Sequence, residues 1–136
     1  MPHVYREVDR LQGQPVVDSG NCVSLIKAYA PGLVGQSTLV WREGARVLDS
    51  PNLERGTAIA TFESGRYPRR NAGQGNHAAF FLWHVSDGFW IMDQYRYGNP
   101  PRLHIGKRFI PKRGKNKDGT YRDPSNNAEA FSVIER

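Results

Sequence analysis

Cysteine is almost absent from this sequence, which contains a single one at position 22. One cysteine cannot form an intramolecular disulfide, and it excludes zinc sites built from several thiolates. We expect no cofactor. The sequence also lacks any apolar run near the ~18 residues that span a bilayer, so we expect no membrane insertion. Residues 1–14 mix charged and polar side chains and do not resemble a Sec signal peptide.

Acidic residues are the minority charge, with 13 Asp and Glu against 19 Lys and Arg, which gives a formal net charge of +6. Such an excess favours an anionic partner, such as nucleic acid, a membrane surface or an acidic polymer. Nine of the basic residues lie between Arg96 and Arg122, where Asp118 is the one acidic residue. This run is typical of a solvated basic face that can hold a protein on an anionic surface.

The chain has the length of one domain, and we predict a single domain over residues 1–136. Apolar spacing predicts a helix over residues 21–30, capped by Asp18 or Ser19 and ended by Pro31-Gly32. A second helix is predicted over residues 37–48. Strands are then expected at 57–62, 77–85, 88–95, 107–110 and 130–134, with an exposed loop at 113–127. Helices followed by an antiparallel meander predict an α+β fold, with N-terminal helices packed on a central antiparallel sheet.

Cys22 lies in the first turn of the first predicted helix. A helix N-terminus carries partial positive charge, which favours the reactive thiolate over the thiol. Gly20 allows a tight turn just before it. Free cysteine is also among the most buried residue types. The sequence therefore leaves two interpretations of Cys22, a nucleophile or a small core residue.

A cysteine nucleophile usually needs a histidine base that is close in space. Among the four histidines, His77 opens a central strand directly after a flexible loop, where a cleft can form. His84 is seven residues along the same strand, so a regular strand places the two on opposite faces. We therefore predict His77 as the base and His84 as a packed histidine.

A third polar group normally orients such a base. Asp93 and Gln94 are the polar residues of the returning strand, and they face opposite ways. A three-residue turn, Ser86 to Gly88, would place Asp93 on the face of His77, whereas a two-residue Asp87-Gly88 turn would place Gln94 there. The sequence does not decide between these registers.

Three arginines precede His77 in a glycine-rich loop: Arg66, Arg69 and Arg70. Guanidinium groups bind carboxylates in bidentate fashion, so these residues are candidates for binding a substrate carboxylate. A solvated loop with solubilising charge is the competing interpretation. Trp83 and Trp90 lie in apolar strands, where core packing is favoured over stacking on a glycan.

Three stretches together resemble the papain-like NlpC/P60 and CHAP cysteine peptidases: GNCVSLIKAY, GTAIATF and GNHAAFFLWHVSDGFWIMDQY. The resemblance covers residues 20–95. More narrowly, the chain resembles the small members that act as peptidoglycan amidase toxins of the type VI secretion system. CHAP proteins often carry Glu-x-Asn where this chain has Asp93-Gln94-Tyr95, and Gln before the nucleophile where it has Asn21.

The resemblance implies Cys22 as the nucleophile, His77 as the base and Asp93 as the orienting residue, with Asn21 and Gln94 in supporting roles. It implies hydrolysis of stem-peptide amides of bacterial peptidoglycan, and secretion into the periplasm of a target bacterium. It also implies a cognate immunity protein. Two alternatives are a papain-like deamidase or acyltransferase, and a basic nucleic-acid-binding module. The second leaves Cys22 and His77 unexplained.

Overall fold

The computed structural model describes residues 1–68, 75–96, 100 and 102–136 of the chain. Its elements, in chain order, are η1 (Val8–Leu11), α1 (Cys22–Tyr29), η2 (Thr38–Val40), β1 (Arg42–Arg46), η3 (Val47–Asp49), β2 (Ala58–Thr61), β3 (Ala78–Val85), β4 (Gly88–Asp93), β5 (Gly106–Pro111), η4 (Pro124–Asn126), η5 (Ala128–Ala130) and β6 (Phe131–Glu135). None of the helices in these described ranges is long and apolar enough to cross a membrane.

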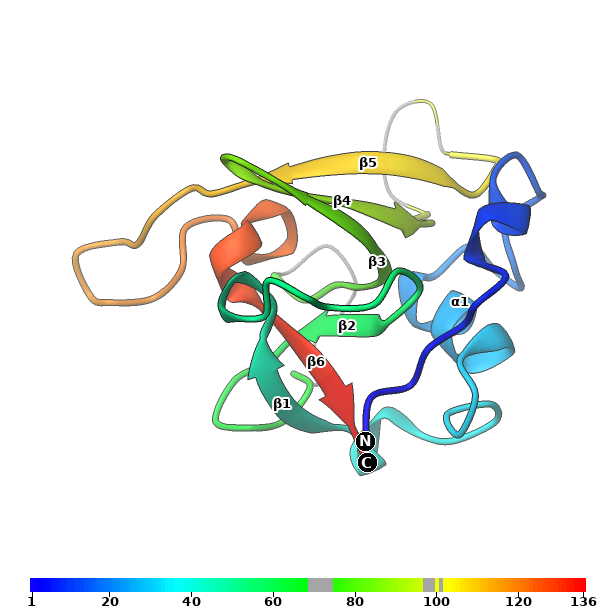
Figure 1. Ribbon diagram of the computed structural model, residues 1–136, viewed down its shortest axis with the longest axis horizontal. Helices are drawn as coiled ribbons and strands as arrows, with labels where there is room; N and C mark the ends of the chain where they lie inside the picture. The colour runs from blue at the N-terminus through cyan, green and yellow to red at the C-terminus, as the bar shows by residue number, and fades with distance from the viewer. Residues whose placement is uncertain (69–74, 97–99, 101) are drawn as a thin grey trace.

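The strands form one six-stranded antiparallel sheet in the order β1-β6-β2-β3-β4-β5 (Figure 1). Alternate strand residues enter two hydrophobic clusters. Phe80 and Leu82 pack with Leu25 of α1, while Phe81 packs with Phe131 in the second cluster. One face of the sheet is therefore covered by α1. The predicted α+β class and its central antiparallel sheet are confirmed.

The predicted helix over residues 37–48 is wrong. Ser37 does cap a helix, but η2 is a single 3₁₀ turn, and Arg42–Arg46 instead pairs with β6 as an edge strand. Gly44 shows why. A Cβ at this position would lie 2.9 Å from the Val133 carbonyl oxygen, so the close approach of β6 requires glycine. Long-range strand pairing overrides the local apolar spacing here.

The β3–β4 hairpin has a register that neither sequence alternative anticipated. Val85 pairs with Gly88, so the turn consists of Ser86 and Asp87 alone. Taken by itself, this turn would place Gln94 on the face of His77.

A β-bulge in β3 changes that outcome. Trp83 pairs with Trp90 but Phe81 pairs with Ile91, which leaves Leu82 as the extra residue. The bulge moves the rest of the hairpin by one position, and continuing the register places Asp93 opposite Ala79, on the face of His77.

The strands predicted at 107–110 and 130–134 correspond to β5 and β6, and each predicted end lies within one residue of the observed end.

Candidate active site

Cys22 is the first residue of α1, and the capping residue is Asn21. The Asn21 Oδ1 atom accepts a hydrogen bond from the Val23 N–H at 3.0 Å. Gly20 has φ +89°, which makes the tight turn expected before the helix. The predicted cap at Asp18 or Ser19 is wrong, because Asn21 takes the capping position. Asp18 instead accepts a hydrogen bond from the Ser24 hydroxyl. As the first residue of α1, Cys22 lies at the positive end of the helix. The residue is only 5% exposed, so its thiol is largely out of water.

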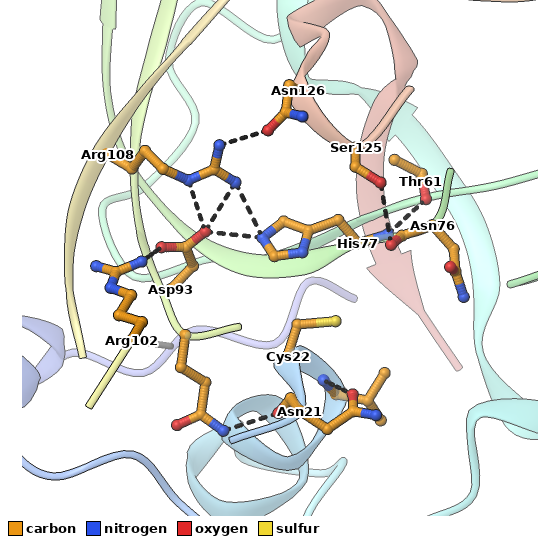
Figure 2. A network of polar contacts seen from close by, with 12 residues as sticks. Asn21, Cys22, Thr61, Asn76, His77, Asp93, Arg102, Arg108, Ser125 and Asn126 are labelled. Carbon is orange, nitrogen blue, oxygen red and sulfur yellow. Dashed lines mark hydrogen bonds and ion pairs between the residues drawn. The ribbon is translucent and has the colours of Figure 1, made fainter. Parts of the chain in front are cut away.

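His77 immediately precedes β3, and its imidazole points toward the Cys22 thiol (Figure 2). Its backbone N–H donates to Thr61 Oγ1 at 3.0 Å, which fixes the start of β3 on β2. The ring packs edge-on against Phe131, with centroids 6.3 Å apart. His77 is therefore a buried, well-oriented histidine beside the cysteine.

Asp93 is the residue that contacts the His77 ring. His77 Nε2 and Asp93 Oδ2 are 2.8 Å apart, which leaves Nδ1 as the ring nitrogen on the side of Cys22. Asp93 is fully buried at the end of β4. The structure thus brings together Cys22, His77 and Asp93, the three residues predicted as nucleophile, base and orienting group.

Two arginines share the Asp93 carboxylate, and the sequence analysis missed both. Arg102 Nη1 lies 2.5 Å from Asp93 Oδ1, and Arg108 Nε lies 3.0 Å from Asp93 Oδ2 (Figure 2). A Cβ at position 106 would lie 2.6 Å from an Arg102 nitrogen, so Gly106 leaves the room that Arg102 occupies. The buried carboxylate is therefore fully paired, as its burial requires. Both arginines belong to the run predicted to be a solvated face.

Gln94 performs a different task on the opposite face of β4. Its side chain accepts a hydrogen bond from the Val17 N–H at 2.6 Å and donates to the carbonyl oxygens of Val17 and Asn21 at 3.0 and 2.7 Å. It therefore holds the segment that leads into α1. Two consecutive residues at one strand end, Asp93 and Gln94, therefore hold the His77 ring and the segment that leads to Cys22.

The electrostatics of the site favour a thiolate and an imidazolium. Burial raises the pKa of Cys22, but the charge of His77, together with hydrogen bonds to His77, the Ala78 backbone and Tyr67, outweighs burial and lowers it. Burial lowers the pKa of His77, but the charge of Cys22 and the bond to Asp93 raise it overall to about 9. For Asp93, His77 and the two arginines outweigh burial, so its pKa lies well below its usual range.

A hollow of about 270 Å³ opens beside this site. Its lining residues are Asn21, Cys22, Asn76, His77, Tyr95, Arg96, Arg108, Asp123, Ser125 and Asn126. The Ser125 hydroxyl donates to the Asn76 carbonyl at 3.2 Å, and Arg108 Nη1 donates to Asn126 Oδ1 at 2.5 Å. The short helix η4 therefore forms part of the cleft wall, although residues 113–127 were predicted to be an exposed loop.

Arg66, one of the three predicted substrate-binding arginines, does not line this hollow. Arg66 is exposed and lines a different hollow, where it donates to the Leu39 carbonyl at 3.4 Å. Arg69 and Arg70 fall outside the described residues. Among the described residues, no contact joins Arg66 to Cys22, so the role of Arg66 in substrate binding stays a prediction.

The other histidines and the tryptophans lie elsewhere. His84 Nε2 lies 2.9 Å from the Ser50 carbonyl, as a packed histidine does. Trp41 is fully buried. Trp83 and Trp90 stack on each other with centroids 5.7 Å apart and are only half-buried.

Comparison with known proteins identifies the relatives of this chain. It is 43% identical to a type VI secretion amidase effector 2 protein of Salmonella typhi, over 99% of this chain and 100% of that protein. It is 33% identical to the domesticated amidase effector 2 of Ixodes scapularis, over 61% of this chain and 63% of that protein. A solved structure of a type 6 secretion amidase effector 2 superposes with a TM-score of 0.82 at 42% identity, covering 98% of this chain and 94% of that one.

These matches confirm the resemblance to small type VI secretion amidase effectors. The family model described as domesticated amidase effector 2 matches residues 4–134, which includes every residue of the site above. The match extends well beyond residues 20–95, where the sequence resemblance was seen. The chain belongs to the domesticated amidase effector 2 family.

Proposed function

We propose that this chain is a cysteine amidase that hydrolyses amide bonds in the peptide stems of bacterial peptidoglycan. The observation that carries the proposal is the position of His77, which faces the thiol at the start of α1 while its Nε2 is bonded to Asp93. The amidase names of the relatives support the reaction class. Papain-like deamidation or acyl transfer would use the same thiol, so the products must decide.

The reaction follows from the roles of three side chains. The Cys22 thiolate attacks a stem-peptide carbonyl carbon, and the carbonyl electrons move to oxygen. Collapse of this intermediate expels the amine, which takes a proton from His77 Nδ1 and leaves a thioester on Cys22. Neutral His77 then removes a proton from water, whose oxygen attacks the thioester carbon. The C–S bond breaks, which restores the Cys22 thiolate and releases the acid, and the acid loses its remaining proton to solvent. Asp93 keeps the ring oriented through both steps.

The oxyanion is stabilised by donors at the start of α1. The Cys22 backbone N–H belongs to the first turn, where such groups have no partner within the helix. The Asn21 Oδ1 atom is engaged by the Val23 N–H, so the amide nitrogen of Asn21 is its available donor. Asn21 lines the hollow beside Cys22. These two donors are the proposed oxyanion hole.

We further propose delivery by a type VI secretion system into the periplasm of a target bacterium, as the name of the Salmonella typhi relative suggests. Such an enzyme needs a cognate immunity protein in the cell that makes it. Because this chain carries a net charge of +6, we expect the contacting face of that inhibitor to be acidic.

Digestion of purified peptidoglycan tests the proposal. We expect wild-type protein to release new amine and carboxyl ends in equal number, identified by mass spectrometry, and Cys22→Ala and His77→Ala to release none. His84→Ala is the matched control, because this histidine lies outside the site, and it should retain activity. Absence of new ends with wild-type protein, or full activity of Cys22→Ala, would refute the proposal.

A further inference from the structure

A second hollow, of about 190 Å³, also borders Cys22. Asn21, Cys22 and Asn76 line both hollows, whereas His77 lines only the first. The leaving amine must lie beside His77 to receive its proton, so that half of the substrate occupies the first hollow. The acyl half, which becomes bonded to Cys22, then extends into the second.

Lys27 supplies the charge of the second hollow. It lies one helical turn after Val23 on the same face of α1, and both residues line the hollow. Its side chain is half-buried. Within the described part of the chain its ammonium group has neither a hydrogen bond nor an ion pair, and no carboxylate lines this hollow. Among the described residues, this half-buried cation, which shares a hollow with Cys22, is thus left without a counter-charge.

Asn76 supplies an unused acceptor. Its side chain is held by a hydrogen bond from Nδ2 to the Pro68 carbonyl at 3.3 Å, and the residue is only 7% exposed. Its Oδ1 atom has no partner among the described residues. Buried acceptors are rarely left unpaired, so this atom points to an N–H donor that arrives with a ligand. Thr38 and Tyr67 complete the polar wall, and Tyr67 Oη lies 3.8 Å from the Cys22 sulfur.

We propose that the second hollow binds the acyl half of the substrate through a free carboxylate on Lys27, with Asn76 Oδ1 accepting from a neighbouring peptide N–H. The proposal rests on the proposed amidase function, because peptide stems carry free carboxylates. It assigns recognition of the carboxylate to Lys27 of α1, rather than to the predicted arginines Arg66, Arg69 and Arg70.

Binding to an inactive variant tests this subsite without turnover. Two stem peptides, identical except for a carboxylate or a carboxamide in the acyl half, are titrated into Cys22→Ala by calorimetry. We expect the carboxylate peptide to bind about tenfold or more tightly, as charge-assisted hydrogen bonds do. Adding Lys27→Met should bring the two dissociation constants within about twofold of each other. Lys117→Met, on the exposed 113–122 segment, is the matched control and should keep the preference.

The outcomes separate the two proposals. Equal binding of the two peptides to Cys22→Ala, or a preference that survives Lys27→Met, overturns the subsite whatever the activity. A Lys27-dependent preference supports it even where peptidoglycan digestion has refuted hydrolysis. Asn76→Ala, with folding checked by a thermal melt, should weaken both peptides by a similar factor and leave the carboxylate preference intact. A loss of the preference in this variant would overturn the assignment of the carboxylate to Lys27.

Discussion

His77 Nε2 lies 2.8 Å from Asp93 Oδ2, and this contact depends on the β-bulge at Leu82. Without the extra residue, the Ser86-Asp87 turn would direct Asp93 to the face of β3 that α1 covers. The bulge therefore decides which of two adjacent polar residues contacts His77. It also frees Gln94 to hold the segment before α1, so that a single strand end positions both His77 and the segment that leads to Cys22.

Replacing Asp93 by asparagine should impair both activity and stability. The substitution removes the charge that His77, Arg102 and Arg108 share, and breaking a buried pair costs about 3–5 kcal/mol. We expect the free energy of unfolding at pH 7 to fall by an amount at the low end of that range, because both arginines retain some solvent access. Activity should fall roughly 10²-fold or more, since the base loses its orienting partner.

Urea denaturation at pH 7 and pH 3 measures this effect, with Asp87→Asn in the exposed turn as the control. The folded pKa of Asp93 lies below the ordinary value of 3.8, so its stabilisation is present above that value and is lost as the pH falls. The gap between wild type and Asp93→Asn should therefore shrink on acidification. A gap that is unchanged at pH 3 would contradict the assigned pairing.

The pH dependence of activity should follow the ion pair. The proposed mechanism requires the Cys22 thiolate and protonated His77. As pH falls, the thiolate is protonated, at a pKa lowered from the ordinary 9.0. As pH rises through about 9, His77 loses the proton that the leaving amine needs. We expect kcat/KM to form a bell whose alkaline limb lies near pH 9.

The rate of Cys22 alkylation by iodoacetamide gives the acid limb independently, and NMR of the His77 ring gives the alkaline one. In Cys22→Ala the His77 pKa should fall well below 9, because the thiolate is the largest of the effects that raise it. An unchanged His77 pKa in that variant would show that the two groups are not paired.

Local patterns predicted the parts of the site that depend on local geometry. Apolar spacing and the Gly20 turn placed Cys22 at a helix start, and His77 lies directly before β3 as its position after a loop indicated. The helix over residues 37–48 failed because pairing of β1 with β6 is a long-range contact. Helical spacing over a short segment does not reveal such a contact.

The arginines of the site were hidden for a related reason. Arg102 and Arg108 lie in a basic run whose local composition is that of a solvated surface, yet a buried carboxylate on β4 recruits both. The β4–β5 register, in which Ile91 pairs with Arg108, sets this contact. Recognising that Asp93 needed a cation was within reach of the sequence. Identifying which of the nine basic residues pair with Asp93 required the register of the sheet.

Gln94 should prove to be a positioning residue for the nucleophile. Gln94→Leu keeps a similar volume but leaves the Val17 N–H and the carbonyl oxygens of Val17 and Asn21 without their buried partner. We expect the free energy of unfolding to fall by about 2–4 kcal/mol. Exposed Gln12→Leu, the control, should change it by about 0.5 kcal/mol or less.

The informative measurement is Cys22 alkylation under conditions where Gln94→Leu is still folded. Since Gln94 fixes the segment that sets where α1 begins, its loss should displace the thiol from His77 and slow alkylation at neutral pH. The decrease in alkylation rate relative to wild type should be larger near pH 7 than at pH 10, because an unpaired thiol also ionises at pH 10. If the variant is destabilised but alkylates at the wild-type rate throughout this range, Gln94 supports the fold without positioning Cys22. An alkylation rate that is slower at pH 7 but recovers at pH 10 would show that Gln94 positions Cys22 for its pairing with His77.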